Sequence, residues 1–302
     1  MRGCTMAYWL VDSPSSGNGG RNSAFWEPYL KECGIENLTC CRLDESAQWC
    51  GLVSESDCLL AAGGDGSVNA VAALCLKTGA TLGVLPSGTA NDFARNLGIP
   101  NKPEDVARLV AEGVVQRVDV ADVGDGICLN VAHVGLGTLP SRQVSAPAKK
   151  SLGRFSYLAT LFRKLGAQRG FYARITTDKS VLEGRWLSVA IATGAYFGGG
   201  HEIPEACAND GLLDVIAVRP RPLLQLLLAF VMVRLNRKTP DRTSTVVQVK
   251  GTRCEVQTNK PKTVTVDGDI AGKTPISMHC RAGVLKVIGR RVVHTGKPER
   301  GT

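Results

Sequence analysis

Two glycine-rich loops, each between a short apolar run and a helix-like segment, constrain the fold of this chain more than any other feature. The first, GGDGS at residues 63–67, follows the run Cys58–Ala62, and the second, PSGTAND at residues 86–92, follows Thr81–Leu85. Apolar runs this short predict buried strands. Glycine lets the backbone approach an anion, and the first N–H groups of a helix have no partner within the helix. Two such loops in adjacent units therefore predict a nucleoside triphosphate site.

The order of predicted elements divides the chain into two domains. Up to about residue 120, predicted strands alternate with helices, which indicates a doubly wound parallel sheet. From Val118 onward, strands separated by turns indicate a mostly antiparallel sandwich that ends in two strands, Ile276–Cys280 and Val284–Ile288. The fold class is thus α/β plus β, with a nucleotide-binding domain at residues 1–120 and a β-sandwich domain at residues 121–302. We expect the active site in the cleft between them.

A third loop of glycine and small polar residues, at residues 12–21, follows the predicted strand Ala7–Val11. Ligands of a doubly wound sheet bind beyond the carboxyl ends of its strands, where all three loops would meet. We therefore interpret this segment, which contains Ser13, as phosphate-facing, with an ordinary turn as the alternative.

The net charge indicates which binding partners to expect, and the cysteine content indicates the cellular compartment. The chain has 36 Lys and Arg against 27 Asp and Glu, a net charge of +9 that favours anionic partners such as ATP, acidic lipid surfaces or nucleic acid. No nucleic-acid-binding motif is present and only 5% of residues are aromatic, so we expect no nucleic-acid partner. The 11 cysteines lie mostly in apolar runs without a CxxC pair, which indicates reduced thiols in the cytoplasm.

The amino-terminal sequence and the apolar stretches also favour a cytoplasmic protein. Asp12 and the glycine-rich loop after it come too early for a signal peptide. The longest apolar stretch, Leu226–Val233, is far short of the roughly 20 residues that a membrane-spanning helix needs.

A series of motifs resembles the diacylglycerol kinase catalytic family, which includes bacterial lipid kinases and the sphingosine and ceramide kinases. These motifs are GGDGS (63–67), LPSGTANDFAR (85–95), LNVA (129–132), YFGGG (196–200), DGLLDV (210–215) and VDGD (266–269). They span nearly the whole chain in the family's order. The resemblance implies an ATP- and Mg²⁺-dependent kinase that phosphorylates a lipid hydroxyl, with diacylglycerol as the first expected substrate and the second domain as the lipid-binding one.

Four positions depart from the family pattern. Ser13 stands where the family has Asn, Leu43 where it often has Thr, Thr193-Gly194 where it has Asn, and Asp269 where Glu is commoner. The catalytic acid is retained in each case. The changes at Ser13 and Leu43 leave open how tightly the chain binds ATP.

The two central loops and Ser13 supply the expected nucleotide contacts. These residues are Ser13, Gly63, Gly64, Asp65, Gly66, Ser67, Ser87, Gly88, Thr89, Asn91 and Asp92. A carboxylate beside a triphosphate repels it unless a cation intervenes, so we interpret Asp65 and Asp92 as Mg²⁺ ligands. For Asp92 the alternative is a helix N-cap, and both interpretations can hold together.

The family match makes Asp267 the expected general base toward the lipid hydroxyl. Asp269 lies two residues on, so in an extended chain both carboxylates share a face and can share a proton. The alternative is an Asp-Gly β-turn without chemistry.

The segment 206–212 resembles the structural Mg²⁺ loop of the bacterial family members. By analogy the ligands are the Asp210 carboxylate and the carbonyls of Cys207 and Leu212. A plain turn is the alternative.

The predicted apolar helix Leu223–Leu235 is followed by a basic cluster at residues 234–242. This pattern suits peripheral contact with an anionic membrane surface, and it equally suits a buried helix with a solvated basic end. Three rival functions stay open: an NAD kinase, a catalytically silent nucleotide-binding regulatory protein, and a module that only binds anionic membranes. A homodimer is also open.

Overall fold

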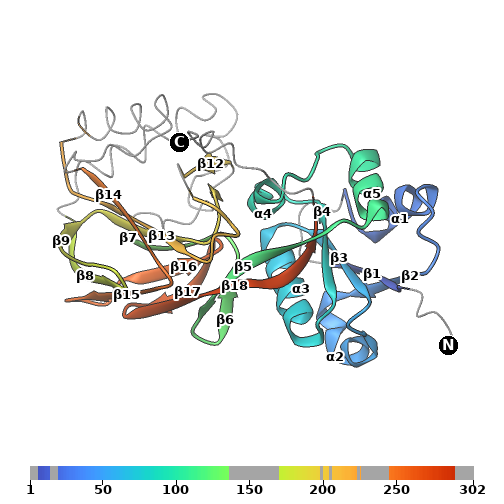
Figure 1. Ribbon diagram of the computed structural model, residues 1–302, viewed down its shortest axis with the longest axis horizontal. Helices are drawn as coiled ribbons and strands as arrows, with labels where there is room; N and C mark the ends of the chain where they lie inside the picture. Colours follow the sequence, from blue (N-terminus) through green and yellow to red (C-terminus); the bar gives the residue numbers. More distant parts are fainter. Residues whose placement is uncertain are drawn as a thin grey trace, which may run out of the picture.

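The amino-terminal half contains a parallel sheet with helices on both faces, as predicted (Figure 1). The computed structural model describes residues 6–13, 20–135, 170–197, 200–203, 206–222, 225 and 245–289. The parallel strands lie in the order β2 (Leu38–Arg42), β1 (Tyr8–Asp12), β3 (Cys58–Gly63) and β4 (Thr81–Pro86). Every residue of β3 and β4 is buried, which is why both read as continuous apolar runs.

Two layers of helices cover this sheet. Helices α1 (Ser23–Glu32) and α5 (Pro103–Glu112) pack on one face. On the other face lie α3 (Asp65–Thr78), α4 (Asp92–Asn96) and α2 (Ser46–Trp49), the last flanked by 3₁₀ turns at Leu43–Glu45 and Cys50–Leu52. Because α3 and α4 begin directly after β3 and β4, the glycine loops lie at the carboxyl edge of the sheet.

The carboxy-terminal half is the predicted antiparallel sandwich. One layer is a sheet in the order β14 (Val246–Gly251), β13 (Leu213–Val218), β10 (Ser188–Ala192), β7 (Val131–Gly135), β16 (Thr263–Val266) and β17 (Asp269–Lys273). The facing layer contains β15 (Arg253–Thr258), β8 (Phe171–Thr177) and β9 (Val181–Trp186). A short hairpin of β11 (Tyr196–Phe197) and β12 (His201–Glu202) stands apart. The fold class predicted from the sequence is confirmed.

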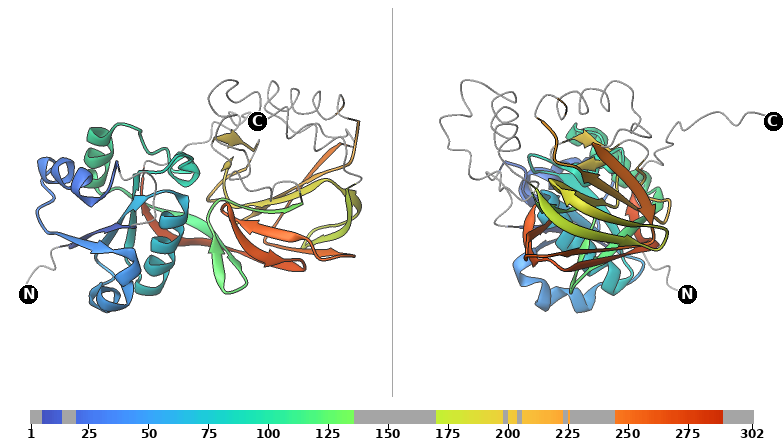
Figure 2. Two further views of the ribbon diagram at one scale, coloured as in Figure 1. Left: turned by 180° about the vertical axis from the view of Figure 1, so that it is seen from behind. Right: turned by 90° about the vertical axis from the view of Figure 1, so that its left-hand side faces the viewer.

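One long strand, β18 (Ile276–Ile288), joins the two halves (Figure 2). Its first part pairs with β15, and Val287 pairs with Leu82 of β4 in the parallel sheet. Strand β5 (Val115–Val123) runs antiparallel along β18 and continues into β6 (Gly126–Cys128). The two final strands predicted from the sequence are therefore one strand, with an irregularity in its pairing to β5 between Arg281 and Leu285.

The connection between the halves is made of strands. The boundary that we predict near residue 120 falls inside β5, and Leu285 and Val287 pack in the core of the amino-terminal half. Apart from Gln225, the predicted apolar helix Leu223–Leu235 lies outside the described residues, as does the basic cluster at residues 234–242. Within the described part of the chain, no helix is both long and apolar enough to span a membrane.

Candidate active site

The two glycine loops pack directly against each other. Gly63 and Pro86 are paired at the carboxyl ends of β3 and β4, and the Ser87 N–H donates to the Gly63 carbonyl at 3.0 Å. A Cβ atom on Gly88 would lie 2.5 Å from the Gly64 Cα. Only glycine permits this approach at position 88, so contact between the loops explains the glycine there.

Side chains of the second loop hold its shape. Asn91 adopts a left-handed backbone conformation (φ 50°), its Oδ1 accepts from the Gly88 N–H at 3.0 Å, and its Nδ2 donates to the Gly88 carbonyl at 2.9 Å. The Ser87 hydroxyl accepts from the Trp26 indole at 2.9 Å and donates to the Leu85 carbonyl. Thr89 is exposed on the loop. Asn91 and Ser87, which we predict to contact the nucleotide, thus make hydrogen bonds that stabilise the loop itself.

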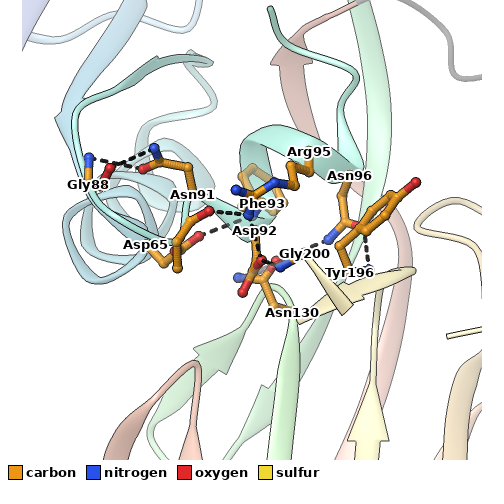
Figure 3. A network of polar contacts seen from close by, with 11 residues as sticks. Asp65, Gly88, Asn91, Asp92, Phe93, Arg95, Asn96, Asn130, Tyr196 and Gly200 are labelled. Atoms are coloured by element: carbon orange, nitrogen blue, oxygen red, sulfur yellow. Dashed lines mark hydrogen bonds and ion pairs between the residues drawn. The ribbon is translucent and has the colours of Figure 1, made fainter. Parts of the chain in front are cut away.

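Asp65 connects the first loop to the helix that follows the second. Its Oδ1 accepts from the Phe93 N–H of α4 at 3.1 Å (Figure 3). Burial raises the pKa of the Asp65 carboxyl, the Phe93 N–H opposes this shift, and the carboxylates of Asp92 and Asp267 add to it. A divalent cation would relieve this concentration of negative charge, and a carboxylate is a suitable Mg²⁺ ligand.

Asp92 is buried and already has strong partners. Its Oδ1 accepts from Arg95 Nη1 at 2.9 Å and from the Gly200 N–H at 2.8 Å (Figure 3). It is the first residue of α4, and Asn91 occupies the N-cap position, so the alternative interpretation of Asp92 as an N-cap is wrong by one residue. The contact with Gly200 links the second loop to the YFGGG motif.

A second contact between the helix after the second glycine loop and the YFGGG motif was not predicted from the sequence. The buried Asn96 donates through Nδ2 to Asn130 Oδ1 at 3.1 Å, and its Oδ1 accepts from the Tyr196 N–H at 2.9 Å (Figure 3). An added Cβ on Gly194 would lie 2.5 Å from Asn96 Nδ2, so the glycine leaves room for this amide. The signal in the sequence was the position of Asn96 between the apolar residues Phe93 and Leu97. Both are buried, and a buried amide needs hydrogen-bond partners.

The VDGD motif forms a two-residue hairpin turn. Val266 of β16 pairs with Asp269 of β17, and Asp267 (φ 48°) and Gly268 (φ 100°) both have the positive φ of a type I′ turn. The expectation that Asp267 and Asp269 share one face of an extended strand is therefore wrong. The Asp-Gly turn that we gave as the alternative is present.

The Asp267 carboxylate is saturated with donors. Its Oδ1 accepts from the N–H groups of Asn130 (2.9 Å) and Val131 (3.0 Å), with the Cys128 thiol at 3.6 Å. Its Oδ2 accepts from the Leu129 N–H and from Asn69 Nδ2, both at 2.8 Å. This single carboxylate thus ties helix α3 to the start of β7.

Asn69 was also missed in the sequence. It lies four residues after Asp65 on α3, so both side chains share the helix face that meets the carboxy-terminal half. Besides Asp267, it donates to the Ile127 carbonyl at 3.0 Å. The four-residue spacing from a predicted site residue was the signal.

Asp269 has a different environment. It is exposed, and its Oδ2 lies 3.7 Å from where a Cβ on Gly66 would be, so it faces the first glycine loop. Within the described residues, no group donates a hydrogen bond to its carboxylate. The two carboxylates of the turn therefore differ: that of Asp267 is held by hydrogen bonds, whereas that of Asp269 faces the first glycine loop.

Family comparisons agree with these motifs. Residues 8–123 match the diacylglycerol kinase catalytic domain, and residues 131–289 match the YegS C-terminal NAD kinase β-sandwich-like domain. The chain belongs to the diacylglycerol kinase catalytic family. The resemblance seen in the sequence is thereby confirmed.

Individual relatives of this lipid kinase family are moderately similar. A "Probable lipid kinase YegS-like" from Stenotrophomonas maltophilia is 30% identical over 247 residues, which cover 76% of this chain and 78% of the relative. A protein of the same name from Xanthomonas oryzae pv. oryzae is 35% identical over 224 residues, or 70% and 72% of the two chains. A crystal structure of a diacylglycerol kinase from Bacillus anthracis superposes with a TM-score of 0.75 at 24% identity, covering 95% of this chain and 98% of that one, and shows the shared fold.

The predicted Mg²⁺ loop directly precedes β13. Asp210 Oδ2 accepts from Lys250 Nζ at 2.8 Å, and its Oδ1 accepts from the Leu212 N–H at 3.1 Å. The Cys207 thiol donates to Asn209 Oδ1 at 2.7 Å. Among the described residues, no group of three or more His, Cys, Asp or Glu side chains is arranged to hold a metal ion.

We expect Gly88→Ala to destabilise the protein by about 1–3 kcal/mol, because the new methyl group must push the two loops apart. Urea unfolding followed by tryptophan fluorescence measures the change. Gly51→Ala is the matched control, since an added Cβ there meets no atom within 4 Å, and its free energy of unfolding should stay within about 0.5 kcal/mol of the parent. Equal stability of the two variants would contradict the close contact between the loops.

Proposed function

We propose that this protein is an ATP- and Mg²⁺-dependent lipid kinase that transfers the γ-phosphoryl group to a lipid hydroxyl, with diacylglycerol as the first candidate. The observation that carries the proposal is the carboxylate of Asp269 facing a glycine loop at the amino terminus of α3. Phosphoryl transfer requires mainly positioning, neutralisation of charge and a group that accepts the hydroxyl proton. The relatives named "Probable lipid kinase YegS-like" support the same class of reaction.

The phosphates would bind at the loops. Gly64 is the N-cap of α3 and has no side chain, so the first N–H groups of this helix are left for an anion. Gly66 and Ser67 continue the same turn, with Ser67 adding a hydroxyl. Gly88 and Thr89 approach from the second loop, which touches Gly64.

Asp65 is the better of the two predicted Mg²⁺ ligands. Asp92 is engaged by Arg95 and Gly200, whereas Asp65 carries a raised pKa next to other carboxylates and gains most from a cation. The ion, when bound with the triphosphate, would neutralise charge on the phosphate oxygens. Asp65 would hold it, and the Phe93 N–H would keep Asp65 in place.

We assign the proton-accepting role to Asp269 and a positioning role to Asp267. Protonation of Asp267 would require it to give up at least one of its hydrogen bonds to residues 129–131 and Asn69. Asp269 has no such partner among the described residues. As the lipid hydroxyl oxygen attacks the γ-phosphorus, its proton passes to the Asp269 carboxylate and ADP leaves.

The same substitution at the two aspartates separates their roles. We expect Asp269→Asn to lower kcat by about 10²–10⁴-fold at an unchanged unfolding midpoint, because only the base is lost. We expect Asp267→Asn to lower the free energy of unfolding by about 1–3 kcal/mol, because an amide cannot accept all these hydrogen bonds. Steady-state kinetics and urea unfolding measure both. An active Asp269→Asn beside an inactive, fully stable Asp267→Asn would reverse the assignment.

Transfer of labelled γ-phosphate from ATP tests the reaction itself. Mixed micelles would contain diacylglycerol, monoacylglycerol, ceramide, sphingosine or phosphatidylglycerol, with NAD in a parallel reaction. We expect Mg²⁺-dependent label in diacylglycerol that is lost in Asp269→Asn. Label in NAD alone would replace the proposal by the NAD kinase alternative, and ATP binding without transfer to any acceptor would favour the regulatory one.

A further inference from the structure

A second group of carboxylates, none of which belongs to the glycine loops, surrounds the turn at residues 207–212. Asp119 lies on β5, Asp210 on the turn and Asp214 on β13. Asp119 and Asp214 are almost fully buried. Carboxylates gathered in this way repel one another unless hydrogen bonds or a cation compensate.

Backbone groups compensate Asp119. Its Oδ2 accepts from the Gly211 N–H at 2.7 Å, and its Oδ1 accepts from the Gly283 N–H at 2.8 Å. The Asp119 N–H donates to the Ala208 carbonyl at 2.8 Å. Asp119 thus holds one side of the turn against β18 without any ion.

A lysine compensates the other two carboxylates. Lys250 lies directly opposite Asp214 in the pairing of β13 with β14. Its ammonium is 2.8 Å from Asp210 Oδ2 and 3.3 Å from Asp214 Oδ2. The other oxygen of Asp214 accepts from Gln248 Nε2 at 2.8 Å, and the other oxygen of Asp210 accepts from the Leu212 N–H.

We propose that the Lys250 ammonium takes the place of the structural Mg²⁺ that the family resemblance implies at the Asp210 loop, so that this chain braces the loop without a metal ion. Mg²⁺ requires about six oxygen ligands in near-octahedral geometry. Here one Asp210 oxygen receives the ammonium and the other receives an N–H group. A divalent ion would have to displace Lys250 and would meet its positive charge, so the residues present do not fit the ion.

The environment of the Lys250 ion pairs also suits permanent stabilisation of the Asp210 loop. The Lys250 side chain is 28% exposed and the Asp214 side chain 2%, so the pair is only partly screened by water. The cation is held by the chain on a strand of the same sheet, and no binding equilibrium is involved. This inference concerns the sandwich and does not depend on the proposed kinase reaction.

Thermal unfolding without nucleotide tests the proposal. We expect the Tm of the parent protein to be the same in EDTA and in millimolar MgCl₂. Lys250→Met should lower the Tm in EDTA by at least about 3 °C, because two carboxylates lose their shared cation. Part of this loss should return with MgCl₂ or MnCl₂, since the freed Asp210 and Asp214 now offer ligands to an added ion.

A matched lysine provides the control. Lys286 is 26% exposed and binds a single carboxylate, Glu55, at 2.8 Å. Lys286→Met should show no recovery of Tm with added cations. Lys250→Arg should keep both the ion pairs and the indifference to Mg²⁺.

Two results would overturn the proposal. The first is a Mg²⁺-dependent rise in the Tm of the parent protein that disappears in Asp210→Asn, since an ion then binds at this loop despite Lys250. The second is a Lys250→Met variant as stable as the parent in EDTA, since the ammonium then braces nothing. Should Lys250→Met not fold in EDTA, its folding in MgCl₂ supports the proposal, and the parent protein alone still decides the first point.

Discussion

The arrangement of the site depends on the contact between two backbones, those of Gly64 and Gly88. Because β3 and β4 end side by side, the loops that follow them come into contact at the carboxyl edge of the sheet, and at position 88 only glycine allows this approach. With the loops in contact, Asp65 reaches the Phe93 N–H and fixes the start of α4. Helix α4 then directs Asp92 and Asn96 toward the carboxy-terminal half, where Gly200, Tyr196 and Asn130 receive them.

The two aspartates of the VDGD turn show how the environment divides the work of identical side chains. Asp267 points inward, where the N–H groups of three successive residues and the Asn69 amide hold it. This places the turn relative to α3, whose amino terminus carries the first glycine loop. Asp269, one strand position beyond the turn, is left facing that loop. In the proposed reaction Asp269 needs this freedom to accept a proton, and Asp267 would keep the turn in position.

Much of the fold and part of the candidate site could be predicted from the sequence, because these features depend on local patterns. Apolar runs, glycine loops and the change from alternating strands and helices to strands alone predict both halves of the fold, the parallel sheet with its helices and the antiparallel sandwich. Contacts between distant residues could not be read in this way. Asn69 and Asp267 are 198 positions apart, and Lys250 meets Asp210 only because β14 pairs with β13. The Asp-Gly dipeptide fits both a turn and a catalytic motif, and only the pairing of Val266 with Asp269 decides its conformation.

The two carboxylate clusters also show why one cation can be built into the chain and another cannot. Around Asp210 and Asp214 the negative charge is constant, so a lysine on the adjacent strand can neutralise it permanently. Around Asp65 the charge changes during the proposed reaction, because a triphosphate brings its own negative charge and leaves as a diphosphate. A lysine fixed beside Asp65 would neutralise the empty site and compete with the ion that accompanies the nucleotide. Burial and the carboxylates of Asp92 and Asp267 raise the pKa of Asp65, which fits a site whose cation would arrive with the nucleotide.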